Sequence, residues 1–184
     1  MAAHTQRIIL ETFQEMLEEK PFHKITVSAL VKRCGISPNT FYYHYEDIYD
    51  LLQTWLGIWL SRFTPQDDWR VTAKALLRDC QENKKLVEHI INYLSKDQIE
   101  TALFAAETES DVFRASVMKM AAGKNVPEKK IRDLADFCRY ASIGFFLRFI
   151  WDHMEADIDQ AVNDLDRYLR CFVQAALQDE PAAG

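Results

Sequence analysis

Glycine is scarce in this chain, with five scattered residues among 184. A loop that cradles a phosphate group through its backbone amides needs several glycines close together, so no such loop is expected. The sequences G-x-S-x-G and H-E-x-x-H are also absent, which removes two common signatures of hydrolase active sites. The sequence therefore predicts no catalytic residues, no cofactor and no enzyme.

The sequence also gives little indication of a metal site or a disulfide bond. The four cysteines form no C-x-x-C pair and lie far apart, at Cys34, Cys80, Cys138 and Cys171. They are typical of small buried apolar side chains in a reducing compartment. The spacing His153-x-Glu155-x-Asp157 does not bring three ligands to one helical face, so no metal site is expected.

Long apolar stretches are missing as well. A membrane-spanning helix needs about 18 or more consecutive apolar residues, and the longest candidate, around residues 140–151, is interrupted by Arg148. No signal peptide opens the chain. We expect no membrane-spanning segment and a cytoplasmic location.

Positive charge is also in short supply, with 22 Lys and Arg against 28 Asp and Glu and a net charge of −6. The acidity belongs to residues 46–184, because residues 1–45 carry five basic and four acidic side chains. A nucleic-acid contact by the first segment would therefore depend on neutral donors and helix dipoles as well as on cations.

What the sequence does have is helical periodicity. Apolar residues make up 48% of the chain and recur at three-and-four spacing, whereas alternation of period two is absent. This pattern predicts an all-α fold of about nine helices, with an N-terminal three-helix domain joined to a C-terminal helical bundle. The expected ranges are about 5–20, 27–34, 38–44, 47–63, 66–81, 83–94, 97–122 with a break near 107–111, 127–154 and 158–177.

Residues 25–45 predict two short helices joined by a tight turn. Thr26 is a good N-cap for the first helix, and Gly35 ends it because glycine enters the left-handed region without a Cβ penalty. Ser37 caps the second helix, and Pro38 occupies its first position. Such a pair is typical of a helix-turn-helix, although an ordinary helical hairpin inside a core has the same outline.

The second helix of this pair has two unlike faces. Phe41 and Tyr45 are four residues apart and face inward. The outward face gathers hydroxyl, amide and aromatic groups, which suit base edges, phosphates and thymine methyl groups in a major groove. The candidate DNA contacts are Thr26, Ser37, Pro38, Asn39, Thr40, Tyr42, Tyr43 and His44.

With an amphipathic helix before it and an acidic-capped helix after it, this stretch resembles the DNA-binding domain of TetR-type transcriptional regulators over residues 6–56. The resemblance divides the chain into a DNA-binding domain, residues 1–46, and a ligand-binding and dimerisation domain, residues 47–184. It implies a homodimer that binds a double-stranded DNA operator, usually as a repressor, and that a small-molecule effector releases or tunes. Many such sequences have a lysine at the start of the helix after the motif, where this chain has Tyr45-Glu46-Asp47-Ile48 and no cation, so one expected phosphate contact is missing.

The last two long helices carry more apolar surface than one domain needs to cover. Small residues among their large ones would allow another helix to approach closely, which favours a two-fold four-helix interface over a core within one chain. The candidate interface residues are Tyr140, Ala141, Gly144, Leu165, Leu169 and Phe172.

A ligand pocket in the C-terminal part is the remaining candidate site. Its lining is predicted from aromatic side chains with two polar anchors, although aromatics at helical spacing also occur in plain cores. The candidates are Trp59, Phe63, His89, Tyr93, Phe104, Phe113, Phe145 and Phe149. The acidity of this part mildly favours a cationic or neutral ligand. Two alternatives to a ligand-responsive regulator stay open. One is a DNA-binding protein of the same fold whose C-terminal domain responds to a protein partner, and the other is a helical enzyme that binds no DNA.

Overall fold

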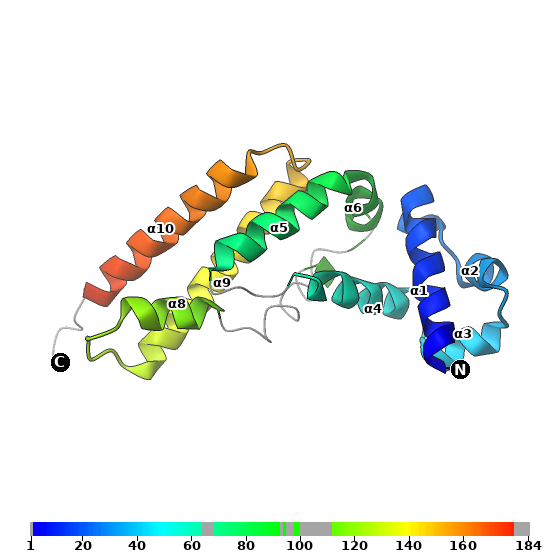
Figure 1. Ribbon diagram of the computed structural model, residues 1–184, viewed down its shortest axis with the longest axis horizontal. Coiled ribbons are helices and arrows are strands. Elements are labelled where there is room, and N and C mark those ends of the chain that lie inside the picture. The colour runs from blue at the N-terminus through cyan, green and yellow to red at the C-terminus, as the bar shows by residue number, and fades with distance from the viewer. Residues whose placement is uncertain (1, 64–67, 93, 95–97, 100–111, 179–184) are drawn as a thin grey trace. The chain divides into compact units, whose positions relative to one another are not determined.

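The structure is a computed structural model that describes residues 2–63, 68–92, 94, 98–99 and 112–178 (Figure 1). Within these residues the regular structure consists of nine α-helices and one short 3-10 helix, so the all-α prediction is confirmed. In the same residues no helix is long and apolar enough to cross a membrane.

The chain forms two compact units, each with its own core. Unit 1 comprises Met1–Arg62 and Asn83–Ala106, and unit 2 comprises Phe63–Glu82 and Glu107–Gly184. The units follow packing, whereas the division at residue 46 separates a motif from the rest of the chain. That division stays a prediction about function.

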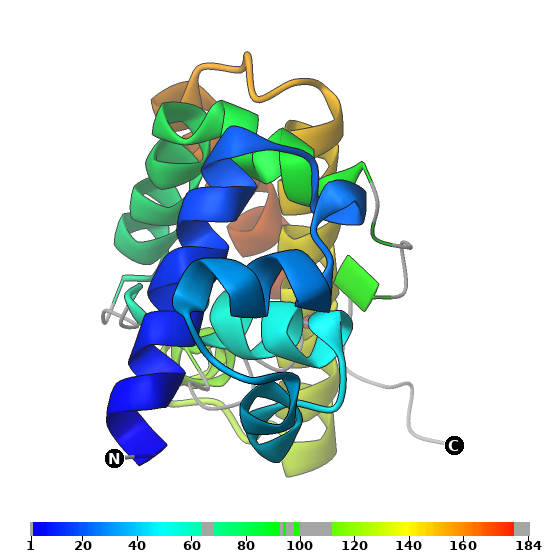
Figure 2. The same ribbon diagram turned by 90° about the vertical axis from the view of Figure 1, so that its right-hand side faces the viewer.

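Unit 1 surrounds the predicted motif. Its α-helices are α1 (Ala2–Glu19), α2 (Val27–Cys34), α3 (Pro38–His44), α4 (Ile48–Ser61) and α6 (Lys84–Ile91), with a 3-10 turn at Phe22–Lys24 (Figure 2). Its core is built from one stripe of each helix, including Ile9, Phe13, Met16, Leu17, Leu30, Phe41, Leu51, Leu52, Leu86 and Ile90. Because α6 joins this core from forty residues downstream, the helix-turn-helix rests on more than its own three helices.

The ends of α2 and α3 are fixed as their sequence predicts. The Thr26 hydroxyl accepts a hydrogen bond from the amide of Ala29 at 3.2 Å, and the Ser37 hydroxyl accepts one from the amide of Thr40 at 3.1 Å. Gly35 has a φ of 69°, in the left-handed region that an L side chain adopts only with strain. These contacts stop one helix and start the next within three residues.

Arg33 joins α2 to α1 through two carboxylates. Its guanidinium donates to Glu19 at 2.6 Å and to Glu15 at 2.9 Å. The hydrogen bond from Arg33 lowers the pKa of the Glu19 carboxyl. Since Arg33 is one of the few basic residues of this segment and is already paired, its charge adds little to any attraction for DNA phosphates.

Unit 2 contains α5 (Trp69–Glu82), α8 (Val112–Met120), α9 (Glu128–Trp151) and α10 (Ile158–Gln178). Helix α10 packs along both α5 and α9, and α8 packs on α9 (Figure 1). Their shared core includes Phe113, Val117, Leu134, Cys138, Leu169 and Val173. Where α9 ends, the side-chain amide of Gln81 donates to the carbonyl of Met154 at 2.7 Å, which attaches the turn before α10 to α5.

Candidate nucleic-acid interface and cavity

Helix α3 presents aromatic and amide groups to solvent from a fixed base. Phe41 is fully buried in the core of unit 1, whereas Tyr42 and Tyr43 are 58% and 79% exposed. Pro38 and Asn39 are exposed at the start of the helix. The orientation predicted from the four-residue spacing is therefore confirmed: one ring anchors α3, and its neighbours point outward.

Some of the candidate DNA-contacting side chains already make hydrogen bonds within the protein, and others do not. The Ser37 and Thr40 hydroxyls lie 2.9 Å apart and share a hydrogen bond, in addition to the capping bond. By contrast, the side-chain amide of Asn39 and the phenol groups of Tyr42 and Tyr43 make no hydrogen bond within the described part of the chain. The latter three side chains are the ones with polar groups available for a partner.

His44 sits between the outward and inward faces. Its ring is half-buried and makes an edge contact with the Tyr43 ring, with centroids 5.1 Å apart. Through this contact, the exposed phenol of Tyr43 has a neighbour that restricts its orientation, which lowers the entropy lost when it binds.

Acidic groups organise the start of α4. Asp47 accepts from the amides of Tyr49 and Asp50, at 2.7 and 2.9 Å, and the Asp50 carboxylate accepts from the amide of Glu46 at 2.9 Å. The predicted cap by Asp47 is thus confirmed, whereas Asp50 bonds the amide of the residue before the cap and not that of Asp47, which a capping box requires. Ile48 is half-buried and packs against the core of unit 1, so it holds the helix start in place of the lysine common in similar sequences.

Reversing the charge at exposed Glu46 should strengthen DNA binding. The Glu46 side chain has no ion pair among the described residues, so Glu46→Lys replaces only a charge near the expected phosphate path. We expect tighter binding to operator and unrelated DNA alike, with the slope of log K against log salt steeper by about 1. Fluorescence anisotropy over a salt series measures the slope. An unchanged slope would mean that the start of α4 does not face the phosphates; Ile48→Lys is less suitable because it also removes packing.

Unit 2 has a cavity of about 520 Å³, partly open to solvent, between α5, α8, α9 and α10. This volume is within the usual range for small-molecule sites, roughly 300–1,000 Å³. Its walls combine apolar side chains with several charged ones. They are Asp68, Trp69, Arg70, Phe113, Ala115, Ser116, Val117, Lys119, Met120, Cys138, Asp166, Leu169, Arg170 and Val173.

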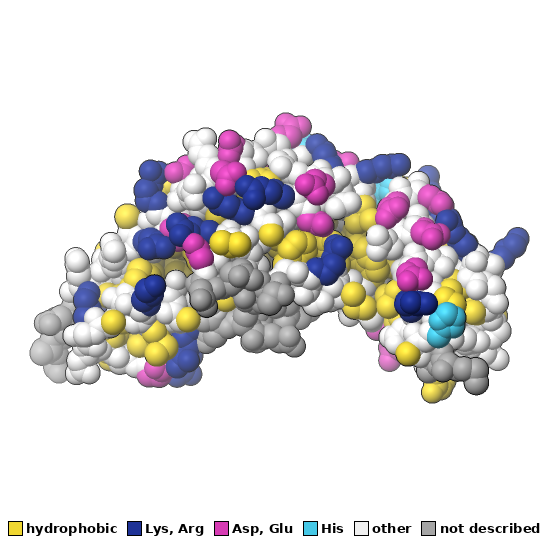
Figure 3. All heavy atoms as spheres, viewed as in Figure 1, with side chains coloured by type: hydrophobic (Ala, Val, Ile, Leu, Met, Phe, Trp, Pro, Cys, Tyr) yellow, Lys and Arg dark blue, Asp and Glu magenta, His cyan; other side chains and the backbone are white. Residues whose placement is uncertain are grey.

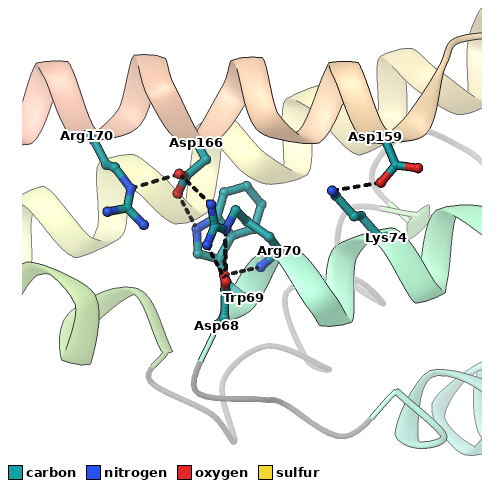
Figure 4. A network of polar contacts seen from close by, with 7 residues as sticks. All are labelled: Asp68, Trp69, Arg70, Lys74, Asp159, Asp166 and Arg170. Atoms are coloured by element: carbon teal, nitrogen blue, oxygen red, sulfur yellow. Dashed lines mark hydrogen bonds and ion pairs between the residues drawn. The ribbon is translucent and has the colours of Figure 1, made fainter.

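A hydrogen-bonded network centred on Asp166 forms one side of this cavity (Figure 4). Asp166 is only 7% exposed. Its carboxylate accepts from the indole of Trp69 at 3.2 Å, from Arg70 at 3.4 Å and from Nε of Arg170 at 2.8 Å. A buried carboxylate needs such donors, since an unpaired charge in this position would cost several kcal/mol, on the order of 3–5.

Asp68 completes the network from the start of α5. It accepts from the backbone and side chain of Arg70, and that guanidinium lowers the pKa of the Asp68 carboxyl. Further along α5, Lys74 and Arg78 both pair with Asp159 at 2.8 Å. Figure 3 shows this alternation of basic and acidic side chains over α5 and α10. These ion pairs connect α5 to α10 at several points along the two helices.

The aromatic residues predicted to line a pocket are distributed over both units. Of those that lie within the described residues, Phe113 alone borders the cavity of unit 2. In unit 1, the Trp59 ring is stacked on Trp55, and Nδ1 of His89 lies 2.7 Å from the carbonyl of Leu17, where it connects α6 to α1. Phe63, Phe145 and Phe149 belong to unit 2 but do not border the cavity, and Tyr93 and Phe104 lie outside the described residues.

The candidate interface residues fall into two groups. Tyr140 and Phe172 are 62% and 41% exposed, and Gly144 is exposed between them in sequence. Ala141 and Leu165 are half-buried, and Leu169 is buried in the core of unit 2, where it borders the cavity. The Phe172 ring stacks on Phe137 of α9 with centroids 4.1 Å apart, so α9 and α10 share an aromatic surface.

Comparison with protein families covers both parts of the chain. The model of bacterial regulatory proteins of the tetR family matches residues 9–54, and that of a transcriptional regulator C-terminal region matches residues 67–171. The chain belongs to the TetR family of transcriptional regulators. This membership makes it a DNA-binding regulator and accounts for the helix-turn-helix geometry of α2 and α3.

Two solved structures share this fold. One is the dihydroxyacetone kinase operon activator DhaS, with a TM-score of 0.64 and 15% identity over 93% of this chain and 97% of that one. Another is a transcriptional regulator of the TerR/AcrR family from Aquifex aeolicus VF5, with a TM-score of 0.50 and 18% identity over 91% and 99%. No curated protein matches the sequence significantly.

The sequence pattern did not identify the polar residues of the C-terminal region that border the cavity. Asp166 and Arg170 are not among the residues that the sequence predicts for a binding site, but both border the cavity. Their four-residue spacing was a signal of pairing along one helix face. Nothing in the local pattern showed that Trp69 and Arg70, almost a hundred residues earlier, would lie against them.

Proposed function

We propose that this protein is a homodimeric transcriptional repressor whose affinity for its operator changes when a small molecule occupies the cavity of unit 2. The DNA-binding part of this proposal rests on the exposed face of α3. The helix exposes Asn39, Tyr42 and Tyr43 and is anchored by the buried Phe41 side chain. An amide can bond to adenine in two places, and phenol groups reach phosphates or thymine methyl groups. The cavity supports a ligand over a protein partner, because a concave site of this volume suits a small molecule.

The exposed aromatic surface of α9 and α10 supports dimerisation. Phe137, Tyr140 and Phe172 are large side chains exposed on these two helices. A second copy would cover the surface by two-fold symmetry. Two recognition helices then meet half-sites about 34–36 Å apart, or a multiple of that distance.

Tyr43→Ala tests the DNA-binding face directly. Because Tyr43 is 79% exposed, removing its ring should leave the free energy of unfolding within about 0.5 kcal/mol. We expect the affinity for the operator to fall about tenfold through loss of its backbone or base contact. The operator is first selected from random duplexes with the intact protein, and affinity is then measured by fluorescence anisotropy.

The matched control is Gln14→Ala, an exposed change on α1 of the same unit. It should bind the operator like the unaltered protein. If Tyr43→Ala also binds normally, α3 does not enter the groove as proposed. A reporter gene behind the selected operator measures the sign of regulation, which matters because DhaS, of similar fold, is named as an activator.

A further inference from the structure

We propose that the cavity of unit 2 binds a small organic monoanion, a carboxylate joined to an apolar body, through Arg170 and Lys119. This inference rests on the proposed function in taking the cavity as the effector site. It goes beyond it by naming the chemical class of the effector and the side chains that select it.

The buried carboxylate of Asp166 in the cavity wall does not need a cationic ligand to balance its charge. Asp166 already accepts hydrogen bonds from Trp69, Arg70 and Arg170, and two of these donors are positively charged. Its charge is compensated within the protein. A ligand ammonium would have to displace one of these donors, and the displaced group would then lose its own partner.

Two cationic side chains of the wall, Arg170 and Lys119, have N–H donors that could bind a ligand. Arg170 donates to Asp166 through Nε alone, and its charge also lowers the pKa of Asp68, but its two terminal nitrogens make no hydrogen bond among the described residues (Figure 4). Lys119 on α8 likewise has no ion pair within the part of the chain that the structure describes. The terminal nitrogens of a guanidinium form a planar fork that matches the two oxygens of a carboxylate.

The charge balance of the wall indicates one negative charge in the ligand. Arg70, Lys119 and Arg170 exceed Asp68 and Asp166 by one positive charge. Cys138 does not alter this balance, because burial raises the pKa of its thiol to about 11 and keeps it neutral. A monoanion neutralises the wall, whereas a doubly charged phosphate ester would add repulsion from the two carboxylates.

The other walls suit an apolar body. Phe113, Val117, Leu169 and Val173 border the cavity and belong to the hydrophobic core of unit 2. A hydrocarbon chain or ring placed against them leaves water, which is favourable in proportion to the apolar area that it buries. The cavity thus joins an anion-binding side to an apolar side, the pattern expected for an amphiphilic acid.

Isothermal titration calorimetry on the full-length protein without DNA tests this assignment, with octanoate as the probe and octan-1-ol as its uncharged counterpart. Octanoate should bind at least about tenfold more tightly than the alcohol, a difference of about 1.4 kcal/mol. Arg170→Gln and Lys119→Gln should each remove most of this preference. Arg167→Gln is the control on the same helix, since Arg167 pairs with Asp164 and does not border the cavity.

Lys119→Gln keeps the test decisive if Arg170→Gln unfolds, because Lys119 is exposed and its replacement leaves the Asp166 network intact. Equal affinity for octanoate and octan-1-ol, or an unchanged preference in Lys119→Gln, would overturn the proposal. No octanoate binding to protein that still binds its operator overturns this inference and leaves the regulator intact. Normal operator binding by Tyr43→Ala overturns the DNA-binding face and does not affect the calorimetry.

Discussion

Phe41→Ala should lower the free energy of unfolding by about 3–5 kcal/mol and abolish operator binding. Phe41 is fully buried, and its ring lies within 5.6 Å of the Tyr45 ring between centroids, in the core of unit 1. The substitution removes apolar contacts and leaves a cavity under the recognition helix. Since a domain is stable by only about 5–15 kcal/mol, the loss is a large part of the total.

Urea denaturation followed by circular dichroism measures this effect, and anisotropy measures DNA binding at the same temperature. Tyr43→Ala, two residues away and 79% exposed, is the matched comparison, because it should lose DNA affinity without losing stability. Phe41→Leu retains most of the apolar volume and should recover most of the stability. A loss below about 1 kcal/mol in Phe41→Ala would contradict its role as the anchor of α3.

The helix-turn-helix could be predicted almost residue by residue because its signals are local. Thr26, Gly35, Ser37 and Asp47 act within four residues of themselves, through caps and a left-handed turn. Such contacts depend on the sequence immediately around them and survive any change in distant packing. For this reason α2 and α3 begin and end where the sequence predicts.

The partners of the C-terminal helices could not be predicted in the same way. An amphipathic stripe shows that a helix is buried but does not identify what covers it. Helix α6 was expected in the C-terminal bundle, yet it packs on α1 and places His89 against the carbonyl of Leu17. The cavity depends on contacts between residues about a hundred positions apart, such as Trp69 and Asp166, which no local pattern encodes.

The charge of the cavity wall differs in sign from the net charge of the second part of the chain. Several of the described carboxylates of this second part lie on the surface and pair with nearby Lys and Arg, as Asp159 does with Lys74 and Arg78. The cavity wall has the opposite balance, because Arg70, Arg170 and Lys119 converge there. Net charge describes the field around a protein, whereas a binding site responds to the few groups that face it.

Phe172→Glu should convert the dimer to monomers and reduce operator affinity sharply. In the single chain Phe172 is 41% exposed, so a glutamate there can reach water at small cost. Within the proposed interface of α9 and α10, the same carboxylate would be buried without a partner, at about 3–5 kcal/mol. The dissociation constant of the dimer should therefore rise more than about 100-fold.

Analytical ultracentrifugation measures the assembly, and circular dichroism verifies that the helices remain. Gln174→Glu is the matched control, because residue 174 is exposed on the same helix but lies about 200° around it from Phe172. Monomers with normal helix content and weak operator binding would agree with the proposal, since one recognition helix alone meets one half-site. A dimer that persists in Phe172→Glu would place the interface on another surface, and the stacked Phe137 and Phe172 rings would then need a different partner.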